Sequence, residues 1–146
     1  MILEGLGSSL PFLVRTPEGV VAAALDALSR LGRLERVSSL YRSPAWPNES
    51  DPPFVNAVAA ISADLAPLPL LSALGGVEAG DVFLDGGDDP LPTPRCALEL
   101  PHRRLADRDF VLAPLAEIAP AWRHPVTGTP ARALLSRLPA VRARAI

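Results

Sequence analysis

The chain has 146 residues, of which 49% are apolar, and a formal net charge of −2. This size suits one domain with its own core, and the slightly acidic balance provides no basic field for nucleic acid. No apolar run reaches the roughly 18–20 residues that span a bilayer, and the single cysteine, Cys96, favours a reducing compartment. We therefore expect one cytoplasmic domain over residues 1–146, monomeric and without nucleic-acid or membrane partners.

The beginning of the chain predicts a strand followed by a helix. Residues 1–6 are short and apolar, as expected of a strand that ends at the following glycine and serines. The segment 16–32 predicts a helix, because Thr16 can cap it, Pro17 suits its first turn and Gly32 can end it.

Two more strands are predicted over 33–41 and 54–65, on either side of a proline-rich loop. In the second strand, alternation places Phe54, Asn56 and Val58 on one face. A carboxamide between two apolar residues needs both a donor and an acceptor. A planar heterocycle with N–H and C=O on one edge would supply both. The alternative is an asparagine that is paired with backbone in the core.

The second half of the chain gives shorter signals. In chain order they predict a helix over 67–79, a brief strand over 81–85 and an extended segment over 97–101. Residues 103–120 predict a helical turn, a strand and another turn, and 129–138 predicts a helix with Thr129 as cap and Pro130 in its first turn. The tail, 139–146, is expected to fray. The order β-α-β-β-α-β predicts an α+β, ferredoxin-like fold, with helices on a mostly antiparallel sheet.

Two segments carry groups suited to polar or anionic ligands. The glycines and serines of 5–10 can offer N–H groups and hydroxyls to a ligand, although an ordinary turn explains them equally. Further along, four cations stand close together: His102, Arg103, Arg104 and Arg108. Cations this close favour a polyanion such as a nucleotide triphosphate. The alternative is solvated charge that is paired with Asp107 and Asp109.

Residues 79–89 hold four acids near three glycines. Mg²⁺ prefers two carboxylates together with phosphate oxygens and water. Asp81 and Asp85 would lie roughly 13 Å apart along a strand, which is too far for one ion. Asp88 and Asp89 follow glycines in a loop, where acids are usually just solvated.

Five segments, taken in chain order, resemble the family of 6-hydroxymethyl-7,8-dihydropterin pyrophosphokinase, an enzyme of the folate pathway. They read "LGSSL", "SSLYRSPAW", "PPFVNAVAAI", "LLSALGGVEA" and "LPHRRLADRDFVLAPLAEIAPAWRHPVTG". The last is highly specific, whereas the others are individually weak. The resemblance implies a ferredoxin-like fold and transfer of a pyrophosphoryl group from ATP, with Mg²⁺, to the hydroxymethyl group of the pterin.

The resemblance also assigns site residues. The pterin site would comprise Ser43, Pro44, Ala45, Phe54, Asn56 and Phe110. Asn56 would hydrogen-bond the pterin edge, and Phe110 would stack on one face. Glu78, His102 and Arg108 would bind ATP. His102 and Arg108 would also be the catalytic residues, because they would hold the triphosphate. Asp81 would bind the metal.

The chain departs from the family pattern at several positions. Phe54 replaces a usual tyrosine, and Arg103 replaces a common proline. The family's long arginine-rich loop is missing, and Ala79 falls on its first metal-binding acid, which leaves Asp81 as the second. An alternative function is therefore a degenerate member that binds pterin or nucleotide without efficient catalysis. A third is an RNA-binding module, which the acidic charge and the few aromatic residues disfavour.

Overall fold

The computed structural model describes residues 2–9, 16–45, 48–64 and 105–146. In chain order its elements are β1 (Ile2–Ser8), α1 (Pro17–Leu31), β2 (Arg33–Val37), β3 (Tyr41–Ser43), β4 (Phe54–Ser62), the 3-10 turn η2 (Leu105–Asp107), α3 (Asp109–Ile118), α4 (Ala131–Arg137) and β5 (Arg144–Ala145). The helix predicted over 67–79, the strand over 81–85 and the extended segment over 97–101 lie outside the described residues. No helix within the described ranges is long and apolar enough to cross a membrane.

The strands form one antiparallel sheet with β4 at its centre. On one side β4 pairs with the full length of β1, from Ile2 opposite Ile61 to Ser8 opposite Val55. On the other side it pairs with β2 and then with β3, and β5 lies beyond β3. This antiparallel sheet with its helices confirms the predicted α+β class.

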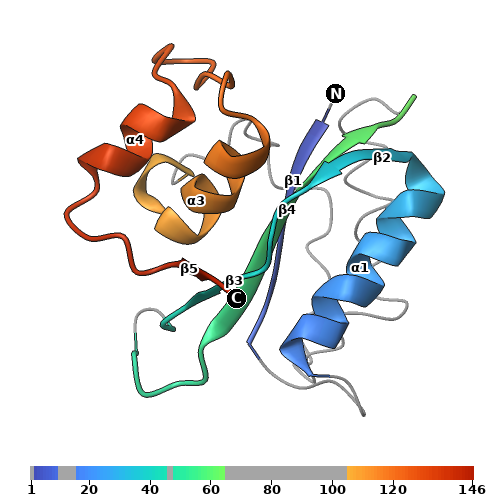
Figure 1. Cartoon of the computed structure of the whole chain (residues 1–146), viewed down its shortest axis with the longest axis horizontal. Helices are drawn as coiled ribbons and strands as arrows, with labels where there is room; N and C mark the ends of the chain where they lie inside the picture. The colour runs from blue at the N-terminus through green and yellow to red at the C-terminus, as the bar shows by residue number, and fades with distance from the viewer. Residues whose placement is uncertain (1, 10–15, 46–47, 65–104) are drawn as a thin grey trace, which may run out of the picture.

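Helices cover both faces of the sheet, with α1 on one side and α3 and α4 on the other (Figure 1). On the α1 side, Val55 and Ala57 belong to a buried cluster with Val21. On the opposite side, Val58 packs in a second cluster with Leu112 of α3. Because both faces are covered, β4 is buried at every position from 55 to 61. A strand buried on both faces reads as a continuous apolar run.

The helix predicted over 16–32 is confirmed as α1. The Thr16 side chain accepts a hydrogen bond of 3.2 Å from the Gly19 N–H, as expected of an N-cap. Gly32 follows the last turn, but its backbone is extended and not left-handed. Glycine is needed there for space, because a Cβ would lie 2.5 Å from the Ser62 carbonyl oxygen.

The prediction of one strand over 33–41 was wrong, because the chain forms β2 and β3 with a break between them. Ser38 causes the break. Its N–H donates to the Val58 carbonyl, and its hydroxyl accepts from the Val58 N–H, both at 2.9 Å. A side chain thus takes the place of a backbone acceptor after β2. A separate shift of register lies within β2, between Leu34 and Arg36.

The strand expected within 103–120 was also wrong, because these residues form α3. Leu112, Leu115 and Ile118 recur every three positions and are all buried, so they form the face that packs against the sheet. Pro114 lies inside this helix. From the sequence alone, a short apolar run that contains a proline is compatible both with a strand and with a buried helix.

The end of the chain differs from its prediction in two ways. The last helix begins at Ala131 with Pro130 as its N-cap, so Thr129 is not the capping residue. The tail does not fray, because Arg144–Ala145 forms β5 on the edge of β3. The Ile146 N–H also donates to the Leu40 carbonyl at 2.9 Å.

Candidate active site

Asn56 and Ser43 meet where β3 and β4 lie side by side. Both side chains are buried, and Asn56 is only 6% exposed. The Asn56 Nδ2 donates to the Ser43 hydroxyl oxygen at 3.2 Å. The partner of the asparagine is therefore a side chain that the resemblance also assigns to the pterin site, and not the backbone expected of an ordinary core residue.

Three further predicted pterin residues adjoin this pair. Phe54 begins β4 directly opposite Ser43 and is 36% exposed, which leaves ring surface open to a ligand. Pro44 and Ala45 follow Ser43 in the chain, and Ala45 is buried. Five of the six predicted pterin residues thus come from two neighbouring strands and the start of their connecting loop.

Gly7 of β1 determines the room available to the Asn56 carboxamide. It lies opposite Asn56 in the ladder, on the side away from β3. A Cβ at position 7 would stand 2.5 Å from the Asn56 Oδ1, which is closer than real Cβ contacts. Glycine at position 7 therefore leaves the space that the Asn56 carboxamide occupies. Residues 5–8 belong to β1 and do not form the turn expected there.

Replacing Gly7 with alanine is expected to lower the free energy of unfolding by about 1–3 kcal/mol, the usual cost of overpacking a core. It should also weaken pterin binding, because the Asn56 side chain must turn away. Gly5→Ala is the matched control, since a Cβ at position 5 of the same strand meets nothing within 4 Å. Urea unfolding of both variants tests this, and equal stability of the two would contradict it.

Arg108 and Phe110 form a second group at the start of α3. Arg108 is the N-cap residue, and its guanidinium carbon lies 5.7 Å from the centre of the Phe110 ring. Within the described ranges Arg108 has no carboxylate partner. Asp109 instead accepts hydrogen bonds from the backbone of Arg142 and Ala143. The paired-charge alternative for Arg108 therefore gains no support from Asp109.

Glu117, near the end of α3, joins this helix to the segment before β3. One of its carboxylate oxygens accepts from the Ser39 N–H at 2.9 Å and from the Ser39 hydroxyl at 3.0 Å. The other oxygen accepts from the Tyr41 hydroxyl at 2.9 Å. Burial raises the pKa of Glu117, but these three hydrogen bonds outweigh it and lower the pKa below its ordinary value. α3 is thus tied to the strand that carries Ser43.

Glu117→Gln is expected to reduce the loss of stability in acid. A carboxylate whose pKa is lowered on folding stabilises the protein above its unfolded-state pKa. That contribution disappears as the pH falls through the lower, folded-state pKa. The amide has no such titration, so its free energy of unfolding should decline less steeply below the ordinary pKa of glutamate. Urea unfolding at several pH values tests this, and identical slopes for the two proteins would contradict it.

Three predicted site residues, Glu78, Asp81 and His102, lie outside the described residues. The part of the chain that the structure describes contains no group of three or more His, Cys, Asp or Glu side chains that could hold a metal ion. The described residues therefore do not fit a metal site on their own, and the assignment of Mg²⁺ to Asp81 stays a prediction.

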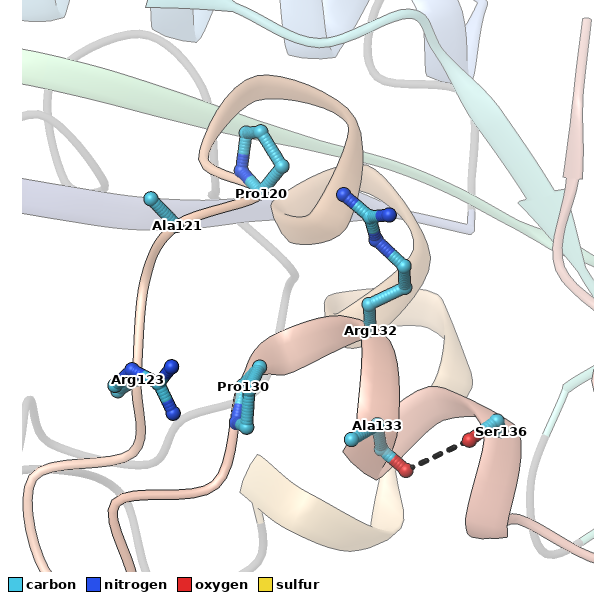
Figure 2. A pocket seen from close by; sticks show the side chains of 7 residues that line it. All are labelled: Pro120, Ala121, Arg123, Pro130, Arg132, Ala133 and Ser136. Atoms are coloured by element: carbon cyan, nitrogen blue, oxygen red, sulfur yellow. Dashed lines mark hydrogen bonds between the residues drawn. The ribbon is translucent and has the colours of Figure 1, made fainter.

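An open hollow lies away from these residues, between the loop after α3 and helix α4. Figure 2 shows Pro120, Arg123 and Arg132 around it, with the Ser136 hydroxyl donating to the Ala133 carbonyl at 2.9 Å. None of its lining residues is a predicted site residue. The hollow is therefore not the site that the sequence indicates.

The sequence did not predict the contacts that Gly7, Asp109 and Glu117 make near the candidate site residues. Asp109 accepts hydrogen bonds from a segment more than thirty residues later in the chain. Glu117 accepts hydrogen bonds from a segment more than seventy residues earlier. Local patterns carry no signal for such pairs. To predict that Gly7 lies beside Asn56, one would need to know the register in which β1 pairs with β4.

Comparison with known proteins gives a consistent family. A family model described as "7,8-dihydro-6-hydroxymethylpterin-pyrophosphokinase" matches residues 4–82. A Pseudomonas aeruginosa protein named 2-amino-4-hydroxy-6-hydroxymethyldihydropteridine pyrophosphokinase is 41% identical over 141 residues, covering 85% of this chain and 83% of its own. Proteins of the same name from Porphyromonas gingivalis (35% over 131 residues; 76% and 87% covered) and Haemophilus influenzae (36% over 131 residues; 78% of each) are also similar.

Proposed function

Because the chain belongs to the 7,8-dihydro-6-hydroxymethylpterin-pyrophosphokinase family, we propose that it transfers the pyrophosphoryl group of ATP to 6-hydroxymethyl-7,8-dihydropterin in folate biosynthesis. The observation that carries the proposal is the buried carboxamide of Asn56, held by Ser43 at the end of the sheet. Such a group suits the edge of a planar heterocycle that offers N–H and C=O together.

In this reaction the hydroxymethyl oxygen of the pterin forms a bond to the β-phosphorus of ATP. The bond between that phosphorus and the oxygen bridging it to the α-phosphorus breaks, so AMP leaves with the electron pair. The hydroxyl proton is lost as the new bond forms. Transfers of this kind depend mainly on positioning and on neutralising charge.

The described residues can supply both requirements in part. Asn56 would orient the pterin in its plane, and Phe54 and Phe110 would lie on its faces. Arg108 would neutralise charge on the triphosphate. His102, which lies outside the described residues, would add to this, and Glu78, also outside them, would contact another part of the ATP. Mg²⁺ bound at Asp81 would neutralise further phosphate charge.

The alternative, a degenerate member that binds without efficient catalysis, gains no support from the comparisons. The similar proteins from the three bacteria are each named as pyrophosphokinases.

Chromatography of the reaction products tests the proposed function. Full-length protein, ATP, Mg²⁺ and the hydroxymethyl pterin should yield AMP and a pterin diphosphate in equal amounts, without ADP. The 6-methyl analogue, which lacks the accepting hydroxyl, should yield no AMP. Pterin binding without any AMP would favour the degenerate member, and ADP as the product would indicate single phosphoryl transfer instead.

The remaining properties of the chain are also part of the proposal. We propose a single domain over 1–146, because β1 and β5, from opposite ends of the described chain, join one sheet. We further propose that it acts as a monomer in the cytoplasm, without nucleic-acid or membrane partners. Sedimentation of the protein at a mass near 15.4 kDa would support the monomer, and twice that mass would contradict it.

A further inference from the structure

We propose that residues 141–146 form a strut that holds the two halves of the pterin site in register, with Asp109 as its positioning residue. This inference rests on the proposed function, because it concerns the site of that reaction. One half of the site is the end of β3 with Ser43, and the other is the start of α3 with Phe110. The strut contacts both halves.

On the helix side, Asp109 binds the strut through its carboxylate. One oxygen, Oδ2, accepts the backbone N–H of Arg142 at 2.6 Å and that of Ala143 at 2.8 Å. Hydrogen bonds to an ionised carboxylate are about twice as strong as those between neutral groups. Asp109 stands between Arg108 and Phe110, so the same bonds fix the backbone that carries both predicted ligand-binding residues.

On the sheet side, the strut is held by backbone pairing. Arg144 lies opposite Arg42, and Ala145 lies opposite Tyr41. The pairing therefore ends one residue before Ser43. Figure 1 shows β5 beside β3, with the chain running to it from α4 past α3. Ala143, between the carboxylate and the paired strand, is only 4% exposed, so the connection is packed.

A third contact reaches the loop between β3 and β4. The Arg142 guanidinium forms an ion pair with Glu49, and this carboxylate raises the pKa of Arg142. The two side chains are 45% and 64% exposed. Exposed ion pairs contribute little, so this contact is secondary to the bonds of Asp109.

Asp109 also lies in the first turn of α3, where any acid favours the helix dipole. A group that served only the dipole would need no partners from another segment. Its two bonds to residues more than thirty positions away distinguish positioning from simple helix stabilisation. Removing the bonds should shift Phe110 and Arg108 relative to Ser43 and Asn56, and small misplacements of binding groups are costly.

The test uses calorimetric titration of the full chain with the hydroxymethyl pterin and a non-hydrolysable ATP analogue, well below the unfolding temperature. Asp109→Ala should weaken pterin binding on the order of 10- to 100-fold. Asp109→Asn keeps an acceptor of the same shape and should restore most of the affinity. Asp107→Ala is the matched control, because it removes an equal charge from the exposed turn two residues earlier.

Amide hydrogen exchange gives a second readout. In Asp109→Ala the amides of Arg142 and Ala143 should lose protection, whereas Asp107→Ala should leave them protected. If Asp109→Ala does not fold, deletion of residues 144–146 removes the pairing with β3 and should weaken pterin binding in the same direction.

Unchanged pterin affinity in Asp109→Ala, or in the deletion, would overturn the strut, as would an equal loss in Asp107→Ala. Failure of the unaltered protein to bind pterin or to release AMP would instead overturn the proposed function.

Discussion

Arg108→Ala is expected to lower kcat about 100- to 1,000-fold, the usual effect of removing one hydrogen-bond donor from the charge that develops in a transition state. This expectation rests on the proposed contact of Arg108 with the triphosphate. Arg108 is the N-cap residue of α3, and its guanidinium carbon lies 5.7 Å from the centre of the Phe110 ring. Its loss should reduce kcat more than it raises the KM for pterin. Steady-state rates of AMP release with each substrate varied in turn would measure both effects.

The control for this prediction is Arg137→Ala, which removes the same charge from the exposed last turn of α4. That variant should keep the kcat of the unaltered protein. Equal rates for Arg108→Ala and Arg137→Ala would show that Arg108 does not contact the triphosphate.

Asn56→Ala is expected to weaken pterin binding by about 1–3 kcal/mol, which corresponds to about 5- to 150-fold in Kd. The cost arises because the polar edge of the pterin would be buried without its partner. The affinity for the ATP analogue should change little, since no triphosphate contact is assigned to Asn56. Calorimetric titration with each ligand separates the two effects.

Ser43→Ala is the companion variant, because it removes only the hydroxyl that accepts from the Asn56 Nδ2 at 3.2 Å. It should weaken pterin binding less than Asn56→Ala does, since the carboxamide remains. Unchanged pterin affinity in Asn56→Ala would contradict the assignment of Asn56 to the pterin site.

The sequence predicted the parts of the fold that depend on neighbouring residues. Thr16 and Pro17 mark the start of α1 through short-range capping and turn chemistry, and the structure confirms that helix. The alternation of Phe54, Asn56 and Val58 along one strand depends only on strand geometry. Both predictions needed no knowledge of what lay across the sheet.

The errors fall where distant residues decide the structure. The break after β2 arises from the hydrogen bonds of Ser38 to Val58, twenty residues on. The tail is ordered because β3 offers it an edge and Asp109 accepts its N–H groups. α3 replaces an expected strand because Leu112 and its neighbours pack on the sheet. Such tertiary contacts override local preference.

In the candidate site, too, some residues could be predicted from the sequence, whereas others depend on distant contacts. Resemblance pointed to Ser43 and Asn56, and the structure brings them together. It could not indicate Gly7 or Glu117, whose effects depend on strand register and on the packing of α3 against β3. Glu78, Asp81 and His102 stay predictions, because they lie outside the described residues.

The most direct test of the proposed reaction follows the oxygen of the new bond. Pterin labelled with oxygen-18 in its hydroxymethyl group is incubated with ATP, Mg²⁺ and the full-length protein, and the products are analysed by mass spectrometry. The proposed attack of that oxygen on the β-phosphorus predicts a pterin diphosphate that retains the label and AMP that carries none. Unlabelled pterin diphosphate, or no diphosphate at all, would contradict it.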